Sequence, residues 1–146
     1  MSAKAQRIPS SLTLRELQRF VVAEVTEAFP EEEFLEEELK RIVGGVLNGF
    51  AHGVLKMQEY GEKKGIIVFK TTDHLATDWM PRKELINHAV YTTGLPRKVV
   101  AYALARMENK IDSFLIQGVT VRVAWLGKIK SAGKGYEVEL SETLQV

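Results

Sequence analysis

Histidine is the first residue type to consider for chemistry, because its imidazole titrates closer to neutral pH than any other ordinary side chain. The chain has three histidines, His52, His74 and His88, which are scattered along the sequence. Asp73 directly precedes His74, but adjacency in sequence does not orient a catalytic pair. The chain has no Cys, and it contains no P-loop, GxGxxG, HExxH or GxSxG motif. We therefore expect no enzyme, no cofactor and no metal site, with the histidines at surface or packing positions.

Basic side chains near the carboxyl end could instead bind anions. These candidate residues share a position on expected strands or on the turn between them, and they are Arg122, Lys128, Lys130 and Lys134. Lys and Arg on such positions can bind phosphates with an affinity that ignores sequence and weakens with salt. The alternative is that they are ordinary solvated charges, with lysine protecting a sheet edge from aggregation. Glu137 and Glu139 favour the alternative, because they repel phosphate.

An acidic run over residues 31–38 surrounds Phe34 and Leu35 with six glutamates. Acidic residues suit the first turns of a helix, where the helix dipole favours negative charge. We expect a solvated helix start here. A surface that binds a basic partner is the alternative, and a metal site is disfavoured because no Asp-rich loop or His pair accompanies the glutamates.

The elements that position these residues follow from hydrophobic periodicity and from helix-capping and turn signals. Thr13 and Glu16 form a capping-box pattern that opens a helix ending at Ala28. A long second helix follows the acidic run and ends near Gly61. The remaining elements are expected in this order: a buried strand over 65–70, a helix from Pro81 to Gly94, a helix from Pro96 to Gly118, and strands over 119–125, 128–130 and 136–140 around a turn at 131–135.

Gly45, Gly49 and Gly53 recur four residues apart within the long second helix. Each glycine costs about 1 kcal/mol relative to alanine in a helix interior. Three on one face indicate that another backbone approaches closely, and we expect the two long helices to cross there.

The order of elements occurs twice, as helix, long helix, glycine and strand. Leu14-Arg-Glu-Leu17 matches Arg82-Lys-Glu-Leu85 with an offset of 68, and Gly65-Ile-Ile-Val-Phe69 matches Gly118-Val-Thr-Val-Arg122 with an offset of 53. The difference of 15 residues places extra length in the first copy. A duplicated unit of this size predicts two copies that share one core about a pseudo-two-fold axis.

The second copy resembles the bacterial histone-like HU and integration host factor family. The resemblance lies in Met80-Pro-Arg-Lys-Glu-Leu-Ile86, Thr93-Gly-Leu-Pro-Arg-Lys98, Phe114-Leu-Ile-Gln-Gly118 and Val121-Arg-Val-Ala-Trp-Leu-Gly-Lys-Ile129, in that order. Members of that family are intertwined homodimers with a helical body and two long β-arms that wrap and bend DNA. The resemblance implies an α+β fold in which a tandem HU-like repeat forms a pseudo-two-fold single-chain dimer with short antiparallel strands.

The expected organisation is a flexible tail over residues 1–12, an armless first copy over 13–79 and a second copy with a short β-hairpin over 80–146. The family's arm carries an Arg-Asn-Pro tip whose proline inserts between bases, but residues 130–135 hold no Arg and no Pro. A wedge mechanism is therefore not expected, because it needs an inserting residue and an arm. Phosphate binding by the body and the short hairpin remains.

Charge divides with the repeat. The net charge of +1 is the sum of −3 over residues 1–79 and +4 over residues 80–146, so the second copy is the half expected to meet phosphate. We expect a non-enzymatic architectural protein that binds the backbone of double-stranded DNA without strong sequence specificity. The alternative is an HU-like structural or protein-interaction module that has lost DNA binding.

The surroundings of the protein also follow from the sequence. No apolar run approaches the roughly 20 residues of a membrane span, and the first residues have no apolar signal-peptide stretch. We therefore expect a cytoplasmic, nucleoid location without membrane contact, as a monomeric pseudo-dimer or as a homodimer.

Overall fold

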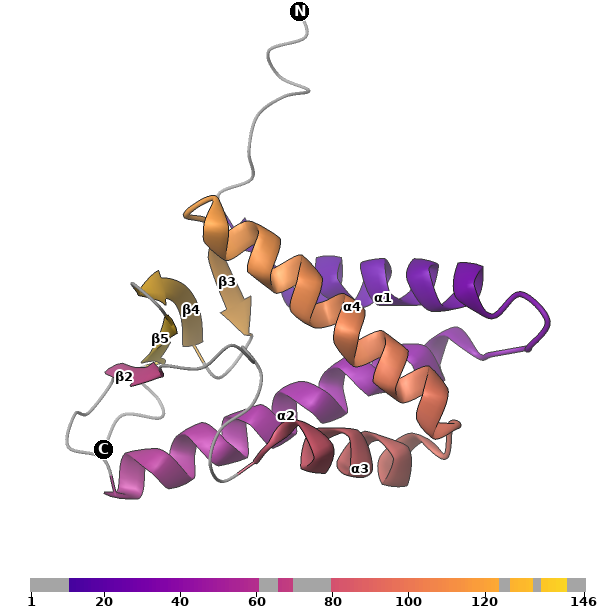
Figure 1. The fold of residues 1–146 in the computed structure, drawn as a ribbon, viewed down its shortest axis with the longest axis horizontal. Coiled ribbons are helices and arrows are strands. Elements are labelled where there is room, and N and C mark those ends of the chain that lie inside the picture. Colours follow the sequence, from indigo (N-terminus) through magenta and orange to yellow (C-terminus); the bar gives the residue numbers. More distant parts are fainter. Residues whose placement is uncertain (1–10, 61–65, 70–79, 124–126, 133–134, 142–146) are drawn as a thin grey trace, which may run out of the picture.

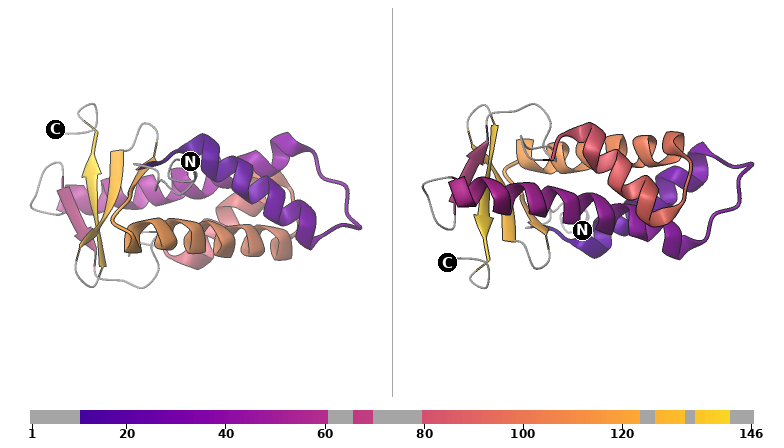
Figure 2. Two further views of the ribbon diagram at one scale, coloured as in Figure 1. Left: turned by 90° about the horizontal axis from the view of Figure 1, so that it is seen from above. Right: turned by 90° about the horizontal axis from the view of Figure 1, so that it is seen from below.

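The computed structural model describes residues 11–60, 66–69, 80–123, 127–132 and 135–141, which form four helices and one five-stranded sheet. The helices are α1 (Leu14–Ala28), α2 (Glu36–Tyr60), α3 (Arg82–Thr93) and α4 (Arg97–Ile116). The strands are β1 (Ser11–Leu12), β2 (Ile66–Phe69), β3 (Thr120–Val123), β4 (Gly127–Ala132) and β5 (Gly135–Leu140). The predicted α+β class is thus confirmed, with the sheet at one end of an elongated helical body (Figures 1 and 2).

The helix ends lie close to where the sequence places them. The Thr13 side chain accepts a hydrogen bond from the Glu16 backbone N–H at 3.3 Å, and the Glu16 carboxylate accepts one from the Thr13 backbone N–H at 3.3 Å. This is the predicted capping box. Gly94 follows α3 with a φ of 74° and Gly118 follows α4 with a φ of 79°, a left-handed conformation that favours glycine.

The acidic run divides at the start of α2. Glu36, Glu37 and Glu38 form the first turn of this helix, as predicted, whereas residues 31–33 precede it. The Lys98 ammonium, at the start of α4, lies 3.3 Å from the Glu32 carboxylate. Glu32 therefore links the α1–α2 connection to α4 through this ion pair. This contact is separate from the favourable interaction of glutamates with the α2 dipole.

The glycine face of α2 packs closely against another helix, as predicted. A Cβ built on Gly45 would lie 3.2 Å from Thr92 Oγ1 and 3.7 Å from Ala89 Cα, and one on Gly49 would lie 2.7 Å from Leu85 Cδ2. The helix that occupies this face at Gly45 and Gly49 is α3. At Gly45 and Gly49 the expectation that the second long helix, α4, crosses this face is wrong, because the short α3 occupies that position.

The sheet has the strand order β1-β3-β4-β5-β2. β3, β4, β5 and β2 pair antiparallel, as predicted, but β1 pairs parallel to β3 through Ser11–Thr120 and Leu12–Val121, so the sheet is mixed. The predicted tail over 1–12 is therefore too long at its carboxyl end, since Leu12 is only 1% exposed. Residues 1–10 of that tail lie outside the described residues.

One hydrophobic core joins the helices to the inner face of the sheet. α4 contacts β1, β3 and β4 as well as the other three helices, so it connects the two layers. The sheet's buried contributions are Leu12, Val121, Ile129, Val138 and Leu140. Because alternate residues of a strand face opposite sides, these five fix which side chains of the sheet face outward. Within the described part of the chain, no helix combines the length and the apolar character needed to cross a membrane.

Candidate functional site

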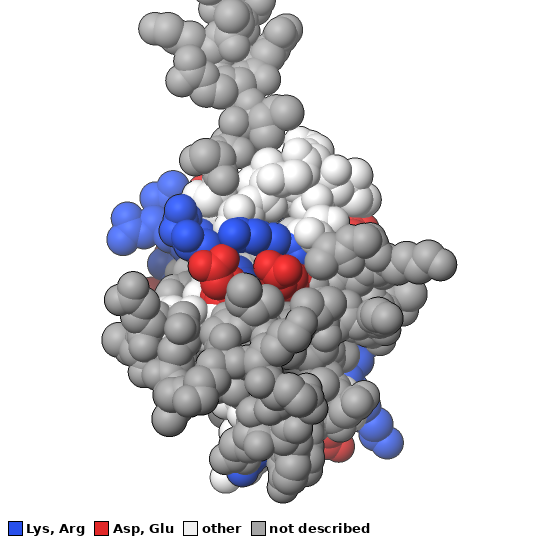
Figure 3. Space-filling model, turned by 90° about the vertical axis from the view of Figure 1, so that its left-hand side faces the viewer, with Lys and Arg blue, Asp and Glu red and all other residues white. Residues whose placement is uncertain are grey.

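The outward face of the sheet carries three of the four predicted phosphate-binding residues. Val121 on β3 and Ile129 on β4 are buried, so the neighbouring Arg122, Lys128 and Lys130 point to the opposite side. Figure 3 looks at this end of the molecule and shows basic side chains in a row beside acidic ones. The fourth predicted residue, Lys134, lies outside the described residues.

Strand register places two of the cations directly opposite each other. Arg122 pairs with Lys128 across β3 and β4, and like charges in such a position repel and destabilise a strand pair. On its other side Lys128 lies opposite Glu139 of β5, which offsets part of this repulsion. Arg122 has no ion-pair partner among the described residues. Positive charge is therefore concentrated towards the β3 side of the outer face.

Lys130 is placed differently, because an acidic side chain neutralises it. Its ammonium donates a hydrogen bond to Glu139 Oε2 at 2.9 Å, and it also lies opposite Glu137 in the strand register. The hydrogen bond from Lys130, and then its charge, hold the pKa of Glu139 below the ordinary value. The Glu139 carboxylate therefore offsets the charge of Lys130, which makes Lys130 the weakest of the three candidates.

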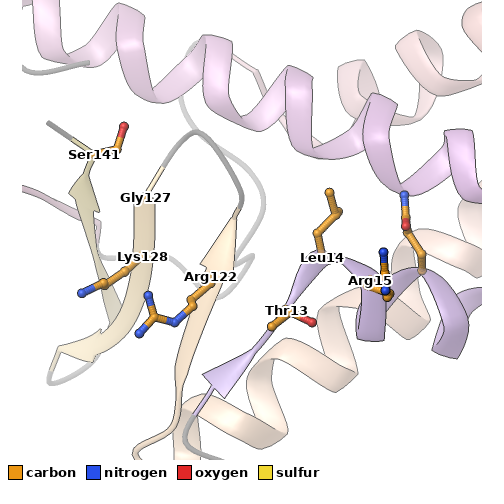
Figure 4. Close-up of a pocket in the computed structure, with 8 residues that line it drawn as sticks. Thr13, Leu14, Arg15, Arg122, Gly127, Lys128 and Ser141 are labelled. Carbon is orange, nitrogen blue, oxygen red and sulfur yellow. The ribbon is translucent and has the colours of Figure 1, made fainter. Parts of the chain in front are cut away.

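A cavity of about 610 Å³ lies between the start of α1 and the β3–β4 strand pair (Figure 4). Arg122 and Lys128 line it from the sheet and Arg15 lines it from the first turn of α1, but the ends of the Arg122 and Lys128 side chains point away from α1. Its lining residues in the described part of the chain are Thr13, Leu14, Arg15, Gln18, Arg122, Gly127, Lys128 and Ser141. None of these is acidic. Two predicted residues therefore line one cavity with Arg15, a cation of the half of the chain over residues 1–79.

Arg15 could not be found by its position in the sequence alone. It lies within residues 1–79, whose net charge is negative, and its sequence signal was that of a helix start. The short parallel pairing of β1 with β3 brings the start of α1 beside β3, and therefore brings Arg15 to the cavity. The available signal was a basic residue inside a capping box, where the helix dipole disfavours positive charge.

Histidine chemistry and metal binding have little support among the described residues. His52 and His88 are exposed on α2 and α3, while His74 lies outside these ranges. No group of three or more His, Asp or Glu side chains in the described part could hold a metal ion. Comparisons of the chain with models of protein families, with curated proteins and with solved structures find no match.

Proposed function

We propose that this chain is a single-chain HU-like pseudo-dimer that binds the backbone of duplex DNA without strong sequence preference and without catalysis. The duplication is supported by the starts of corresponding elements. α1 and α3 begin 68 positions apart, at Leu14 and Arg82, and β2 and β3 begin 54 positions apart, at Ile66 and Thr120. The first offset equals that of the sequence match, and the second differs from its counterpart by one residue.

Helix packing supports the same proposal. α1 packs on α2 and α3 packs on α4, which are contacts within each copy. α1 also packs on α4 and α2 packs on α3, which are the corresponding contacts between the copies. Such reciprocal pairing is what an isologous, intertwined dimer has when its two subunits are joined in one chain.

The observation that carries DNA binding is the Arg122–Lys128 pair. Two cations that face each other across a strand pair, on the solvent side of the sheet, are arranged to favour an anion between or above them. Phosphates that bind there release counterions, which gives the affinity its dependence on salt. Only two positions, 133 and 134, separate β4 from β5, so the hairpin is short and the proposed contact lies on the sheet.

The experiment compares duplex binding by the natural chain with that of a double variant, Arg122→Gln with Lys128→Gln. Fluorescence anisotropy of a labelled duplex is followed over a range of salt concentrations. The loss of two phosphate contacts should reduce the slope of log K against log salt by about 1.8. The matched control, Arg19→Gln with Lys83→Gln, removes the same charge from exposed positions on α1 and α3 and should keep the slope. Equal slopes for the two double variants would contradict the proposed interface.

A second candidate function is an HU-like structural or protein-interaction module that no longer binds DNA. The observation in its favour is the Lys130–Glu139 ion pair, which neutralises the β4–β5 half of the outer face. Micromolar protein that gives no shift of duplex DNA at about 50 mM salt would support this candidate and exclude the first, because backbone contacts are strongest at low salt.

A further inference from the structure

The charge on the outer face of the sheet changes sign between β4 and β5. Strand register aligns Arg122 of β3 with Lys128 of β4, and it aligns Lys128 with Glu139 of β5. Val138 and Leu140 on either side of Glu139 are buried, so Glu139 lies on the same outer face as the two cations. The positive part of this face therefore ends at β4, where a carboxylate lies next to it.

Glu139 interacts with both lysines of β4. Its carboxylate accepts a hydrogen bond from the Lys130 ammonium at 2.9 Å, diagonally across the two strands, and it lies directly opposite Lys128 in the register. The hydrogen bond and charge of Lys130, followed by the charge of Lys128, hold the pKa of Glu139 below its ordinary value. Glu139 is therefore ionised at neutral pH, and it competes with any phosphate for Lys130.

Glu137 makes the surroundings of Lys130 still more acidic. It lies directly opposite Lys130 in the register, although the ion pair of Lys130 is with Glu139. Cross-strand neighbours have Cβ atoms about 5 Å apart, well within the Debye length of about 10 Å at 0.1 M salt. A phosphate that contacts Lys130 must therefore lie beside two carboxylates, whereas Arg122 lies opposite a lysine.

We propose that Glu139 confines duplex contact to the β3 side of the outer face, because it holds Lys130 in the place of a phosphate. The inference deepens the proposed function and rests on it. Glu139 acts through Lys130, so it is a positioning residue rather than a residue that touches DNA. The bound duplex contacts Arg122 and Lys128, while Lys130 stays with Glu139.

The decisive variant is Glu139→Gln, which keeps the size of the side chain and removes its charge. Lys130 then becomes available for one further phosphate. Fluorescence anisotropy of a labelled duplex over a range of salt concentrations should show about eightfold tighter binding at about 0.1 M salt, and a salt slope steeper by about 0.9. The midpoint of urea unfolding reports whether the variant keeps the fold of the natural chain.

The matched control is Glu137→Gln, which removes the same charge from the same face of β5 without breaking the Lys130 ion pair. It should leave the salt slope unchanged, since it frees no cation. Lys130→Gln adds a second control, because its effect should depend on Glu139. Alone it should leave the slope of the natural chain unchanged, and combined with Glu139→Gln it should abolish the steeper slope.

The outcomes separate this inference from the proposed function. Equal salt slopes for Glu139→Gln and Glu137→Gln, with duplex binding by the natural chain, would overturn the role of Glu139 and leave the proposed function standing. Duplex binding by Glu139→Gln alone, lost again on adding Lys130→Gln, would support the role of Glu139 and overturn the proposed function of the natural chain. Duplex binding by neither chain would overturn both.

Discussion

The glycine face of α2 gives the sharpest test of the helix packing. Gly44 and Gly49 lie in the same helix, but their surroundings differ. A Cβ on Gly44 would meet nothing within 4 Å, whereas a Cβ on Gly49 would lie 2.7 Å from Leu85 Cδ2 and 3.5 Å from Met80 Cγ. Leu85 is fully buried, so its side chain cannot turn away into solvent. Alanine at these two positions therefore separates helix propensity from close packing.

The expected magnitudes have opposite signs. Alanine in place of glycine in a helix interior gains about 1 kcal/mol, and Gly44→Ala should show this gain in full. Gly49→Ala has the same gain, but forcing an extra carbon into a packed core costs about 1–3 kcal/mol. Its net effect should lie between zero and about 2 kcal/mol of destabilisation. Gly45→Ala should lie between the two, because the nearest atom, Thr92 Oγ1, is 3.2 Å away and belongs to an exposed residue.

Urea unfolding followed by far-UV circular dichroism measures these differences, with the m-value as a check that the unfolding transition itself has not changed. We expect the midpoint to rise for Gly44→Ala and to remain or fall for Gly49→Ala. Equal stabilisation by both substitutions would show that α3 does not lie against α2 at Gly49, and it would refute the assignment of the glycine face to the α2–α3 contact.

Three further predictions concern helix ends and charges. Arg15→Gln should raise the free energy of unfolding by about 0.3–1 kcal/mol in thermal unfolding without ligand, because it removes a cation from the positive end of the α1 dipole. Gly94→Ala should lower that free energy by about 1–2 kcal/mol, since Gly94 has a φ of 74° that L-residues disfavour even where space is open. Lys130→Gln should raise the pKa of Glu139 towards its ordinary value in an NMR titration, because Lys130 is the main cause of the lowered pKa. A lowered folded-state pKa means that Glu139 stabilises the natural chain above its unfolded-state pKa, and that this contribution is lost as pH falls through the folded-state pKa.

Local signals in the sequence were sufficient for the helices. The capping box at Thr13, the left-handed glycine Gly94 after α3 and the glycine spacing in α2 each depend on neighbours within a few positions, and each was predicted. β1 was not, because a two-residue strand has no periodicity to detect. It forms because Leu12 is buried beside β3, a contact that spans more than a hundred positions of the chain.

The candidate site also combines a feature that local sequence signals predict with one that they do not. Alternation within single strands predicted that Arg122, Lys128 and Lys130 share a face, and they do. Which of these cations would be neutralised depended on the register between β4 and β5, which no local signal fixes. That register places Glu139 opposite Lys128 and diagonal to Lys130, with which it forms the ion pair. Arg122, on β3, has no ion-pair partner in the described part of the chain.

Net charge was the wrong quantity for deciding which half of the chain contributes cations beside the sheet. Residues 1–79 total −3 and were expected to take no part, yet Arg15 lines the same cavity as Arg122 and Lys128. An exposed charge acts mainly within a Debye length, about 10 Å at 0.1 M salt, so the glutamates of the α1–α2 connection, at the far end of the body, weaken such a site little (Figure 1). Within that range the fold, rather than the composition of each copy, sets the sign of the potential.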